Sequence, residues 1–311
     1  MRTQRLGSSG PEVSVIGYGS WEAGGGIWGA NPPEDQLIDA IRSGLDAGIN
    51  WIDTAEIYGK GKSETIVGLA AEGRDDVMIF TKVAPRGAGT GFEPDRVRVA
   101  AESSLKRLGR DTIDLFQLHW PDDSVEVEDT WEAMAALKAE GIVRYIGVSN
   151  FDRSLIERCE KIEHVDSLQP QFSMLHRDGR DDLFPFCRAN GTGIICYGPL
   201  AYGLLTGVID RDTKFQDDDW RSGGTGIGYY RELFAPGVID KNLEIVEGLR
   251  PIADRLGITP AQLALAWVVH QDGVTGAIAG SRSTKHVVEN GEAGDVQLEQ
   301  KDLDEIESLL H

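Results

Sequence analysis

Short apolar runs alternate with amphipathic stretches along the whole chain. Eight of these runs are too short for helices and are mostly rich in β-branched or aromatic residues. They predict strands at residues 15–19, 50–54, 77–82, 113–119, 143–149, 165–169, 193–197 and 274–279. Apolar positions with helical spacing predict helices at residues 33–47, 63–72, 94–108, 125–139, 153–162, 181–189, 242–256 and 260–270. The chain therefore consists of a repeated strand–helix unit.

Several element boundaries carry their own signals. Gly48 and Gly109 each follow the end of a predicted helix, where glycine commonly terminates the helical conformation. The segment Thr259-Pro260-Ala261-Gln262 reads as a capping box with proline at the first helical position. Residues 3–6 and 12–14 flank a glycine-rich turn and predict a β-hairpin that could plug one end of a barrel.

Eight consecutive strand–helix units favour a closed (β/α)₈ barrel, an α/β fold also called a TIM barrel. A doubly wound open sheet more often has five to seven strands. No linker or shift in composition divides the chain, so we expect residues 1–311 to form one domain. The irregular stretch 198–240, after the seventh strand, is longer than an ordinary connection, and we expect it to fold over the barrel mouth.

The charge balance narrows the choice of partners. The chain has 31 Lys plus Arg against 51 Asp plus Glu, a formal net charge of −20, which argues against nucleic acids and anionic membranes. Its three cysteines have neither metal-ligand spacing nor an even number, so we predict no disulfide framework and no metal site. No segment reaches the ~18 apolar residues of a membrane span, and we expect a cytoplasmic protein.

One glycine-rich segment imitates a dinucleotide-binding motif. Residues 24–29 satisfy G-x-G-x-x-G, but Pro32 and Pro33 follow closely, so these glycines cannot open a helix directly onto a pyrophosphate. We therefore reject a Rossmann site. A loop after the first strand is the better interpretation, and it would carry Trp21 and Trp28 toward the mouth.

Polar side chains occupy the ends of three neighbouring predicted strands. Asp53, Lys82 and His119 end the second, third and fourth strands, and Tyr58 follows Asp53 by five residues. Each one alone would most often be a structural residue. The carboxyl ends of barrel strands meet at one mouth, however, where such enzymes hold their catalytic groups. A buried lysine also needs a counter-charge, which Asp53 could supply.

Motifs at these and later strand ends resemble one known family. They are Asp53-Thr54-Ala55 with Tyr58-Gly59, Thr81-Lys82, Leu118-His119-Trp120-Pro121, Gly147-Val148-Ser149-Asn150-Phe151, Gln169-Pro170-Gln171, Tyr197-Gly198-Pro199-Leu200, Ala279-Gly280-Ser281-Arg282 and Glu289-Asn290. Together, over essentially the whole chain, they are similar to the aldo-keto reductase superfamily. Its members are NADPH-dependent reductases built on a (β/α)₈ barrel.

The resemblance implies specific roles for these positions. It implies a catalytic tetrad of Asp53, Tyr58, Lys82 and His119. It also implies that Ser149, Asn150 and Gln171 bond the nicotinamide carboxamide and that Tyr197 stacks on the nicotinamide ring. The other residues it implies for the cofactor cleft are Gly198, Pro199, Leu200, Gly280, Ser281, Arg282, His286, Glu289 and Asn290.

Carbonyl reduction explains why such residues are needed. A hydride must reach carbon and a proton must reach oxygen, so the site requires an acid and a group that stabilises developing negative charge. We expect Tyr58 to be the acid, with its pKa lowered by the Lys82 cation. Asp53 would keep Lys82 charged, and His119 would hydrogen-bond the carbonyl oxygen.

The adenosine end departs from the better-known family members. They have an arginine for the 2′-phosphate where His286 stands here, and Arg282 could take over that contact near a helix N-terminus. We predict NADPH as cofactor and leave NADH use open. Four aromatic residues could wall the pocket for a small aldehyde or ketone: Trp21, Trp28, Trp120 and Phe151. The pattern carries no signal for an oligomeric state.

Two other classes of function are weighed against a reductase. Some relatives in this superfamily bind the nucleotide and turn over slowly as redox sensors or regulatory subunits, but the complete tetrad favours an enzyme. A metal-dependent barrel hydrolase would need paired histidines or clustered carboxylates at strand ends. The six histidines of this chain include no such pair, which argues against that class.

Overall fold

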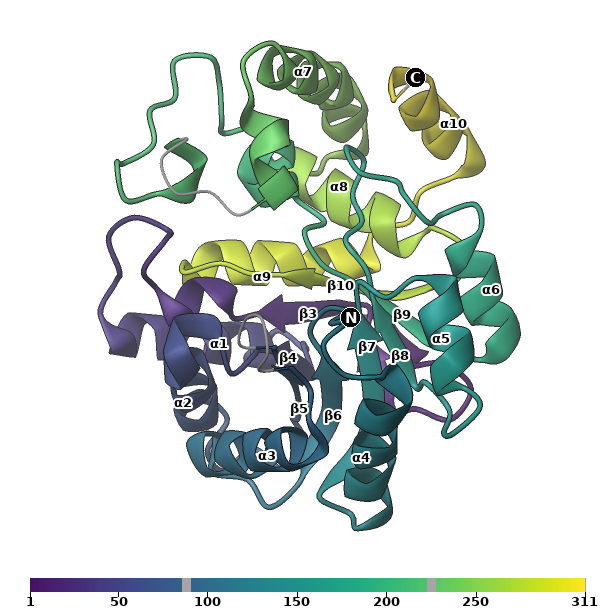
Figure 1. The fold of residues 1–311 in the computed structure, drawn as a ribbon. Coiled ribbons are helices and arrows are strands. Elements are labelled where there is room, and N and C mark those ends of the chain that lie inside the picture. Colours follow the sequence, from purple (N-terminus) through teal and green to yellow (C-terminus); the bar gives the residue numbers. More distant parts are fainter. Residues whose placement is uncertain (86–90, 223–227, 311) are drawn as a thin grey trace.

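Eight parallel strands close into a barrel at the centre of the molecule (Figure 1). The structure is a computed structural model that describes residues 1–85, 91–222 and 228–310. Around the barrel the order is β10, β3, β4, β5, β6, β7, β8 and β9. The strands are β3 Ile16–Gly19, β4 Trp51–Asp53, β5 Met78–Val83, β6 Ile113–Leu118, β7 Val143–Ser149, β8 Ser167–Gln169, β9 Gly193–Cys196 and β10 Val274–Ala279. The predicted (β/α)₈ barrel is confirmed.

Helices surround the strands, as the ribbon shows (Figure 1). They are α1 Glu34–Asp46, α2 Lys62–Ala70, α3 Pro94–Leu108, α4 Val127–Ala139, α5 Arg153–Cys159, α6 Leu183–Asn190, α7 Val238–Leu256, α8 Pro260–Val269, α9 Thr284–Glu292 and α10 Gln300–Leu309. Neighbours pack against one another from α1 to α5, and α9 packs on both α1 and α8. The predicted capping box begins α8: the Thr259 hydroxyl accepts from the Gln262 N–H at 3.2 Å, and the Gln262 amide oxygen accepts from the Thr259 N–H at 3.0 Å.

Two apolar layers hold the barrel together. The outward faces of the strands pack against the helices, and the inward faces form a separate cluster that includes Trp51, Phe80 and Leu115. Strands β1 Thr3–Arg5 and β2 Glu12–Ser14 form the predicted antiparallel hairpin, and Leu6 and Val13 join that inner cluster. The hairpin therefore closes the barrel end opposite the mouth.

One glycine is required for this interior to pack. A Cβ added at Gly17 of β3 would lie 2.2 Å from the ring of Trp51. The indole N–H of Trp51 donates to the Ser14 carbonyl at 2.8 Å, which fixes the ring against β3. Substitution at Gly17 would therefore displace the largest side chain of the inner layer.

The long stretch after β9 folds over the barrel mouth, as predicted. It contains 3₁₀ turns at Ala201–Thr206, Trp220–Ser222 and Gly228–Phe234. Residues Trp28 and Asp219 form an antiparallel bridge between this stretch and the loop after β3. Part of its glycine-rich segment, residues 223–227, lies outside the described residues. Helix α7 begins at Val238, four residues earlier than predicted, after Gly237 in the left-handed conformation.

No helix in the described ranges is both long enough and apolar enough to cross a bilayer.

Candidate active site

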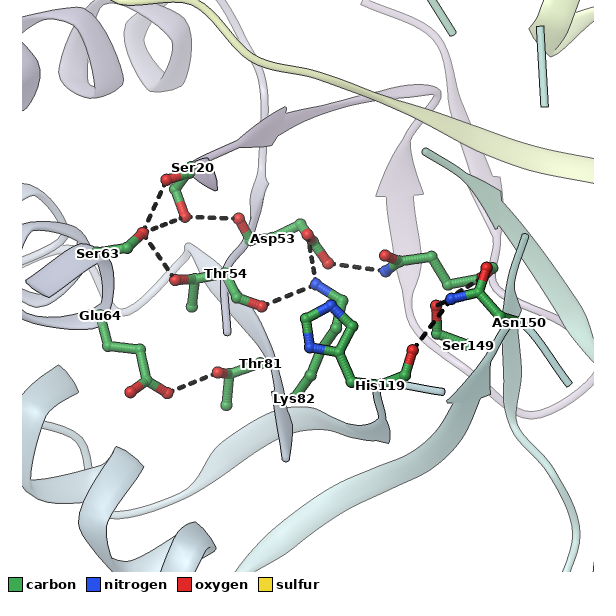
Figure 2. Close-up of polar contacts among 11 residues, drawn as sticks. Ser20, Asp53, Thr54, Ser63, Glu64, Thr81, Lys82, His119, Ser149 and Asn150 are labelled. Carbon is green, nitrogen blue, oxygen red and sulfur yellow. Dashed lines mark hydrogen bonds and ion pairs between the residues drawn. The ribbon is translucent and has the colours of Figure 1, made fainter. Parts of the chain in front are cut away.

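A buried ion pair forms the floor of the barrel mouth. Lys82 Nζ lies 2.6 Å from Asp53 Oδ1 and donates at 2.8 Å to the Thr54 carbonyl (Figure 2). The Gln169 amide donates to the other Asp53 oxygen at 2.8 Å. The Lys82 side chain is 0% exposed and that of Asp53 is 5% exposed. Both come from adjacent strands whose register brings their ends together.

Burial and contact act on this pair in opposite directions. Removal from water raises the pKa of Asp53 and lowers the pKa of Lys82, because each charged form loses its solvation. The 2.6 Å contact and the bond from Gln169 oppose these shifts. The pair is thus held by residues on three strands, and removing either Lys82 or Asp53 would leave the other as an unpaired buried charge.

A second set of polar contacts, made by the first turn of α2, fixes the ends of β4 and β5. The hydroxyls of Ser20 and Ser63 lie 2.7 Å apart, and Ser63 contacts the Thr54 hydroxyl at 3.0 Å (Figure 2). The Thr81 hydroxyl donates to the fully buried carboxylate of Glu64 at 2.6 Å. These bonds join α2 to both strands, so they position the backbone on either side of the ion pair.

Tyr58 begins the 3₁₀ turn Tyr58–Gly61 above this pair, and Lys82 Nζ lies 5.2 Å from its ring centroid. Burial raises the pKa of Tyr58 well above its usual value of 10, and the charges of Asp53 and Tyr230 add to the rise. The expected lowering by Lys82 is therefore wrong for this state of the protein. The main reason is burial of the phenol, and Asp53, which pairs with Lys82 at 2.6 Å, raises the pKa further.

His119 follows β6 and faces Tyr58, with 5.6 Å between the two ring centroids. Burial and the Lys82 charge hold the pKa of His119 well below 6.5, so the imidazole is neutral at pH 7. Its Nδ1 is buried and has no hydrogen-bond partner in the described part of the chain. Nε2 is therefore the nitrogen available to a molecule bound above Tyr58.

These groups open into a cavity of about 1230 Å³ at the mouth. Three of the four predicted pocket residues line it, namely Trp21, Trp28 and Trp120. The fourth prediction, Phe151, is wrong: its side chain is 3% exposed and packs in the hydrophobic core between the barrel and the helices. Aromatic side chains from the long loop take its place, with Tyr202 and Tyr230 both lining the cavity.

The residues expected at the nicotinamide end lie beside His119. Asn150 has a left-handed backbone with φ of 60°, which is uncommon outside glycine and occurs often at functional sites. Its amide donates to the His119 carbonyl at 3.1 Å, and its oxygen accepts from the Tyr197 hydroxyl at 2.8 Å. Gln171 differs from the other residues predicted at this end because it is not among those that line the cavity; its amide is buried and bonds to nothing among the residues that the structure describes. Ser149 donates to the Gln169 carbonyl at 2.8 Å.

The other cofactor predictions line the same cavity: Tyr197, Gly198, Pro199, Leu200, Gly280, Ser281, Arg282, His286, Glu289 and Asn290. Among them Arg282 is engaged by the loop after β3. Its Nε lies 3.3 Å from Glu22 Oε2, and its Nη1 donates to the Ala30 carbonyl at 2.9 Å. A Cβ at Gly280 would lie 2.6 Å from the Gly19 carbonyl, so only glycine allows this close approach of β10 to β3.

Sequence reasoning gave no role to three residues of this site. Gln169 ends β8, where its position could have suggested a partner for Asp53. Glu22 and Tyr230 lie in loops without periodic pattern. Only the contacts of Glu22 with Arg282 and of Tyr230 with Tyr197 show that they belong to the site.

Comparison with known proteins agrees with this geometry. The model of the aldo/keto reductase family matches residues 15–311. The chain belongs to the aldo/keto reductase family. The predicted class of enzyme, a carbonyl-reducing oxidoreductase, is thereby confirmed.

Individual relatives cover the whole chain. Aldo-keto reductase YhdN of Bacillus subtilis is 34% identical over 318 residues, which span 100% of this chain and 94% of the relative. The solved structure of the glycerol dehydrogenase AKR11B4 from Gluconobacter oxydans has a TM-score of 0.88 and 31% identity over 99% of this chain and 94% of its own. An aldo-keto reductase from Klebsiella pneumoniae in complex with NADPH has a TM-score of 0.77 and 32% identity over 99% and 95%.

Proposed function

We propose that this aldo/keto reductase reduces an aldehyde or ketone to an alcohol, with NADPH as hydride donor and Tyr58 as general acid. One observation carries the proposal. The Tyr58 ring lies at the cavity wall, with its centroid 5.2 Å from the Lys82 ammonium and 5.6 Å from the centroid of the His119 ring. The proton donor and the neutral imidazole thus both line the cavity, and the cation lies buried beside the proton donor.

Each of the three side chains has a distinct part in this reaction. NADPH supplies the hydride when bound. Tyr58, whose raised pKa keeps its hydroxyl protonated, donates the proton to the carbonyl oxygen. His119 Nε2–H donates a hydrogen bond to the same oxygen, and the Lys82 charge favours the developing alkoxide. Asp53 and Gln169 position Lys82 beneath the tyrosine.

The nicotinamide end suits a carboxamide. The buried Gln171 amide offers an acceptor and donors whose hydrogen-bonding capacity is unused among the described residues, and a carboxamide needs both kinds of partner. Asn150 and Ser149 supply further polar groups at the cavity wall. Tyr197 lines the cavity and is held by its bond to Asn150, so its ring is fixed as a surface for stacking.

The adenosine end suits a phosphate. Arg282 precedes α9, and Ser281, Ser283 and His286 line the cavity around the start of that helix. Helix N-termini attract anions, and a guanidinium offers charge-assisted bonds to phosphate oxygens. In a protein of net charge −20, this local pocket favours NADPH. The Klebsiella relative in complex with NADPH supports the same choice.

Tyr58→Phe tests the assignment of the acid. Oxidation of NADPH by a simple aromatic aldehyde should fall about 100- to 10,000-fold in kcat, because the phenol is the proton donor. NADPH affinity, followed by tryptophan fluorescence, should change less than about twofold. Tyr145→Phe on β7, in the inner layer of the barrel, is the matched control and should keep full activity.

Two outcomes contradict the proposal. Retention of more than about a tenth of the wild-type kcat by Tyr58→Phe, a loss of ~1.4 kcal/mol or less in transition-state stabilisation, removes Tyr58 as the acid. A wild-type enzyme that binds NADPH yet reduces no aldehyde or ketone in stopped-flow measurements would instead fit a slow nucleotide-binding sensor.

A further inference from the structure

Glu22 pairs with Arg282, the residue proposed above to bind the 2′-phosphate of NADPH. Glu22 follows Trp21 in the 3₁₀ turn Trp21–Gly24, and its Oε2 lies 3.3 Å from Arg282 Nε. Both side chains are half-buried, at 26% and 28% exposed. Arg282 Nη1 also donates to the Ala30 carbonyl at 2.9 Å. Two edges of the guanidinium are therefore engaged by one loop.

The neighbouring arginine does not replace Arg282 as the partner of Glu22. Arg221 directs Nε and Nη2 at the two oxygens of Asp219, at 2.9 and 2.6 Å, and Nη1 at the Tyr202 carbonyl at 3.1 Å. Its three nitrogens are all in use. Arg282 is accordingly the cation that Glu22 reaches, and the charge of Arg282 opposes the rise in the pKa of Glu22 that burial causes.

A 2′-phosphate at this end of the cavity meets both members of the pair. To bond Arg282 through Nε it must displace the Glu22 carboxylate, which then stands unpaired beside an anion. Like charges at such a distance repel, most strongly where water is partly excluded. A nucleotide with a free 2′-hydroxyl makes no such demand and leaves the pair intact.

We infer that Glu22 is a specificity-determining residue that competes with the nucleotide 2′-phosphate for Arg282 and so limits the preference for NADPH over NADH. The inference rests on the proposed cofactor orientation, with Arg282 as phosphate ligand. It gives the loop after β3 two tasks: Trp21 lines the substrate cavity, and Glu22 sets the strength of the phosphate contact. Neutralising Glu22 should therefore strengthen binding of one class of nucleotide only.

Titration calorimetry with two adenosine fragments tests this without any turnover. The probes are adenosine 2′,5′-bisphosphate and adenosine 5′-phosphate, which differ only in the 2′-phosphate. Glu22→Gln should bind the bisphosphate about three- to tenfold more tightly than wild type, as expected for removing one competing ion pair. Affinity for the monophosphate should stay within about twofold.

Three further variants complete the design. Arg282→Ala should weaken binding of the bisphosphate about tenfold or more. Adding Glu22→Gln to Arg282→Ala should tighten the bisphosphate less than Glu22→Gln does alone, because only the repulsion between carboxylate and phosphate is left to relieve. Glu34→Gln removes one exposed carboxylate from the start of α1 and controls for net charge, so its affinities should match wild type. Glu22→Asp keeps the charge but shortens its reach. The affinity of Glu22→Asp for the bisphosphate should lie between those of wild type and Glu22→Gln. If Glu22→Gln does not fold, Glu22→Asp serves as the test variant instead.

The outcomes separate this inference from the proposed function. If wild type and Glu22→Gln both bind the two fragments equally, Arg282 is not the phosphate ligand and the proposed cofactor orientation fails with it. If wild type prefers the bisphosphate and Arg282→Ala removes the preference, the orientation stands. In that case the inference is overturned, and the proposed orientation kept, if Glu22→Gln binds both fragments with wild-type affinity or binds both more tightly by the same factor.

Discussion

The two ends of the mouth cavity each hold an ion pair, and the pairs differ in burial and in origin. At the catalytic end the Lys82 and Asp53 side chains are 0% and 5% exposed, and both extend from barrel strands. At the adenosine end Arg282 and Glu22 are several times more exposed and lie in connections after β10 and β3. Strand register fixes the first pair, whereas loop conformation fixes the second.

This difference fits what each end must do. In the proposed reaction Lys82 has to stay beneath Tyr58 throughout, so partners on three strands and full burial suit it. A phosphate-binding arginine has to change partners whenever the nucleotide enters or leaves. A half-exposed carboxylate that water can replace allows such exchange at low cost. The fold thus places permanent contacts on strands and exchangeable contacts on loops.

The largest expected effect compares the two pairs directly. Lys82→Met should lower the free energy of unfolding by about 3–5 kcal/mol, because it leaves the Asp53 carboxylate buried without its counter-charge. Arg282→Ala should cost about 1 kcal/mol or less, since its partner can be hydrated. Urea unfolding of both variants at one pH measures the difference. Similar losses for the two variants would show that burial does not distinguish these ends.

A smaller effect concerns the pH dependence of the free energy of unfolding, to which His119 contributes. The folded protein holds the pKa of His119 well below 6.5, whereas the unfolded chain binds a proton near that value. Stability from this group is therefore present above pH 6.5 and falls as the pH decreases below it, by up to about 1.4 kcal/mol per unit. His119→Gln should lack this part of the decrease in the free energy of unfolding at low pH.

His164 supplies a control of opposite sign. Its bond with Glu160 raises the pKa of His164. Its contribution to stability is therefore complete below about pH 6.5 and is lost as the pH rises through the folded pKa. The free energy of unfolding should therefore be measured between pH 5 and 8 for both variants. Relative to wild type, His119→Gln should lose less stability toward low pH, and His164→Gln should lose less stability toward high pH. Parallel profiles would mean that His119 is not held neutral by its surroundings.

Prediction from sequence succeeded where strand ends decide position. Asp53, Lys82 and His119 could be placed together because the carboxyl ends of barrel strands converge whatever the loops do. The hairpin plug and the α8 capping box were also predictable, since each depends on a few residues close in sequence. The roles of these catalytic residues stay predictions until variants are measured.

Prediction failed where environment or loop conformation decides. Phe151 follows a strand end as the catalytic residues do, but its side chain turns into the core, which a one-dimensional pattern cannot show. The pKa of Tyr58 rises mainly because the phenol is buried, and the Asp53 charge adds to the rise; both effects depend on the folded site. Glu22 meets Arg282 across 260 positions of sequence, with no periodic signal at either residue.

The smallest expected effect links a loop to the nicotinamide end. The Tyr230 hydroxyl donates to that of Tyr197 at 3.1 Å, and Tyr197 in turn donates to Asn150. Tyr230→Phe keeps the ring contacts and removes one hydrogen bond, so NADPH should bind about two- to tenfold more weakly. Adenosine 2′,5′-bisphosphate lacks the nicotinamide and should bind as in wild type. In a Tyr197→Phe background the added change should weaken NADPH less than it does in wild type, because the bond between the two hydroxyls is already absent. Equal weakening of NADPH and the fragment would instead place the action of Tyr230 at the adenosine end.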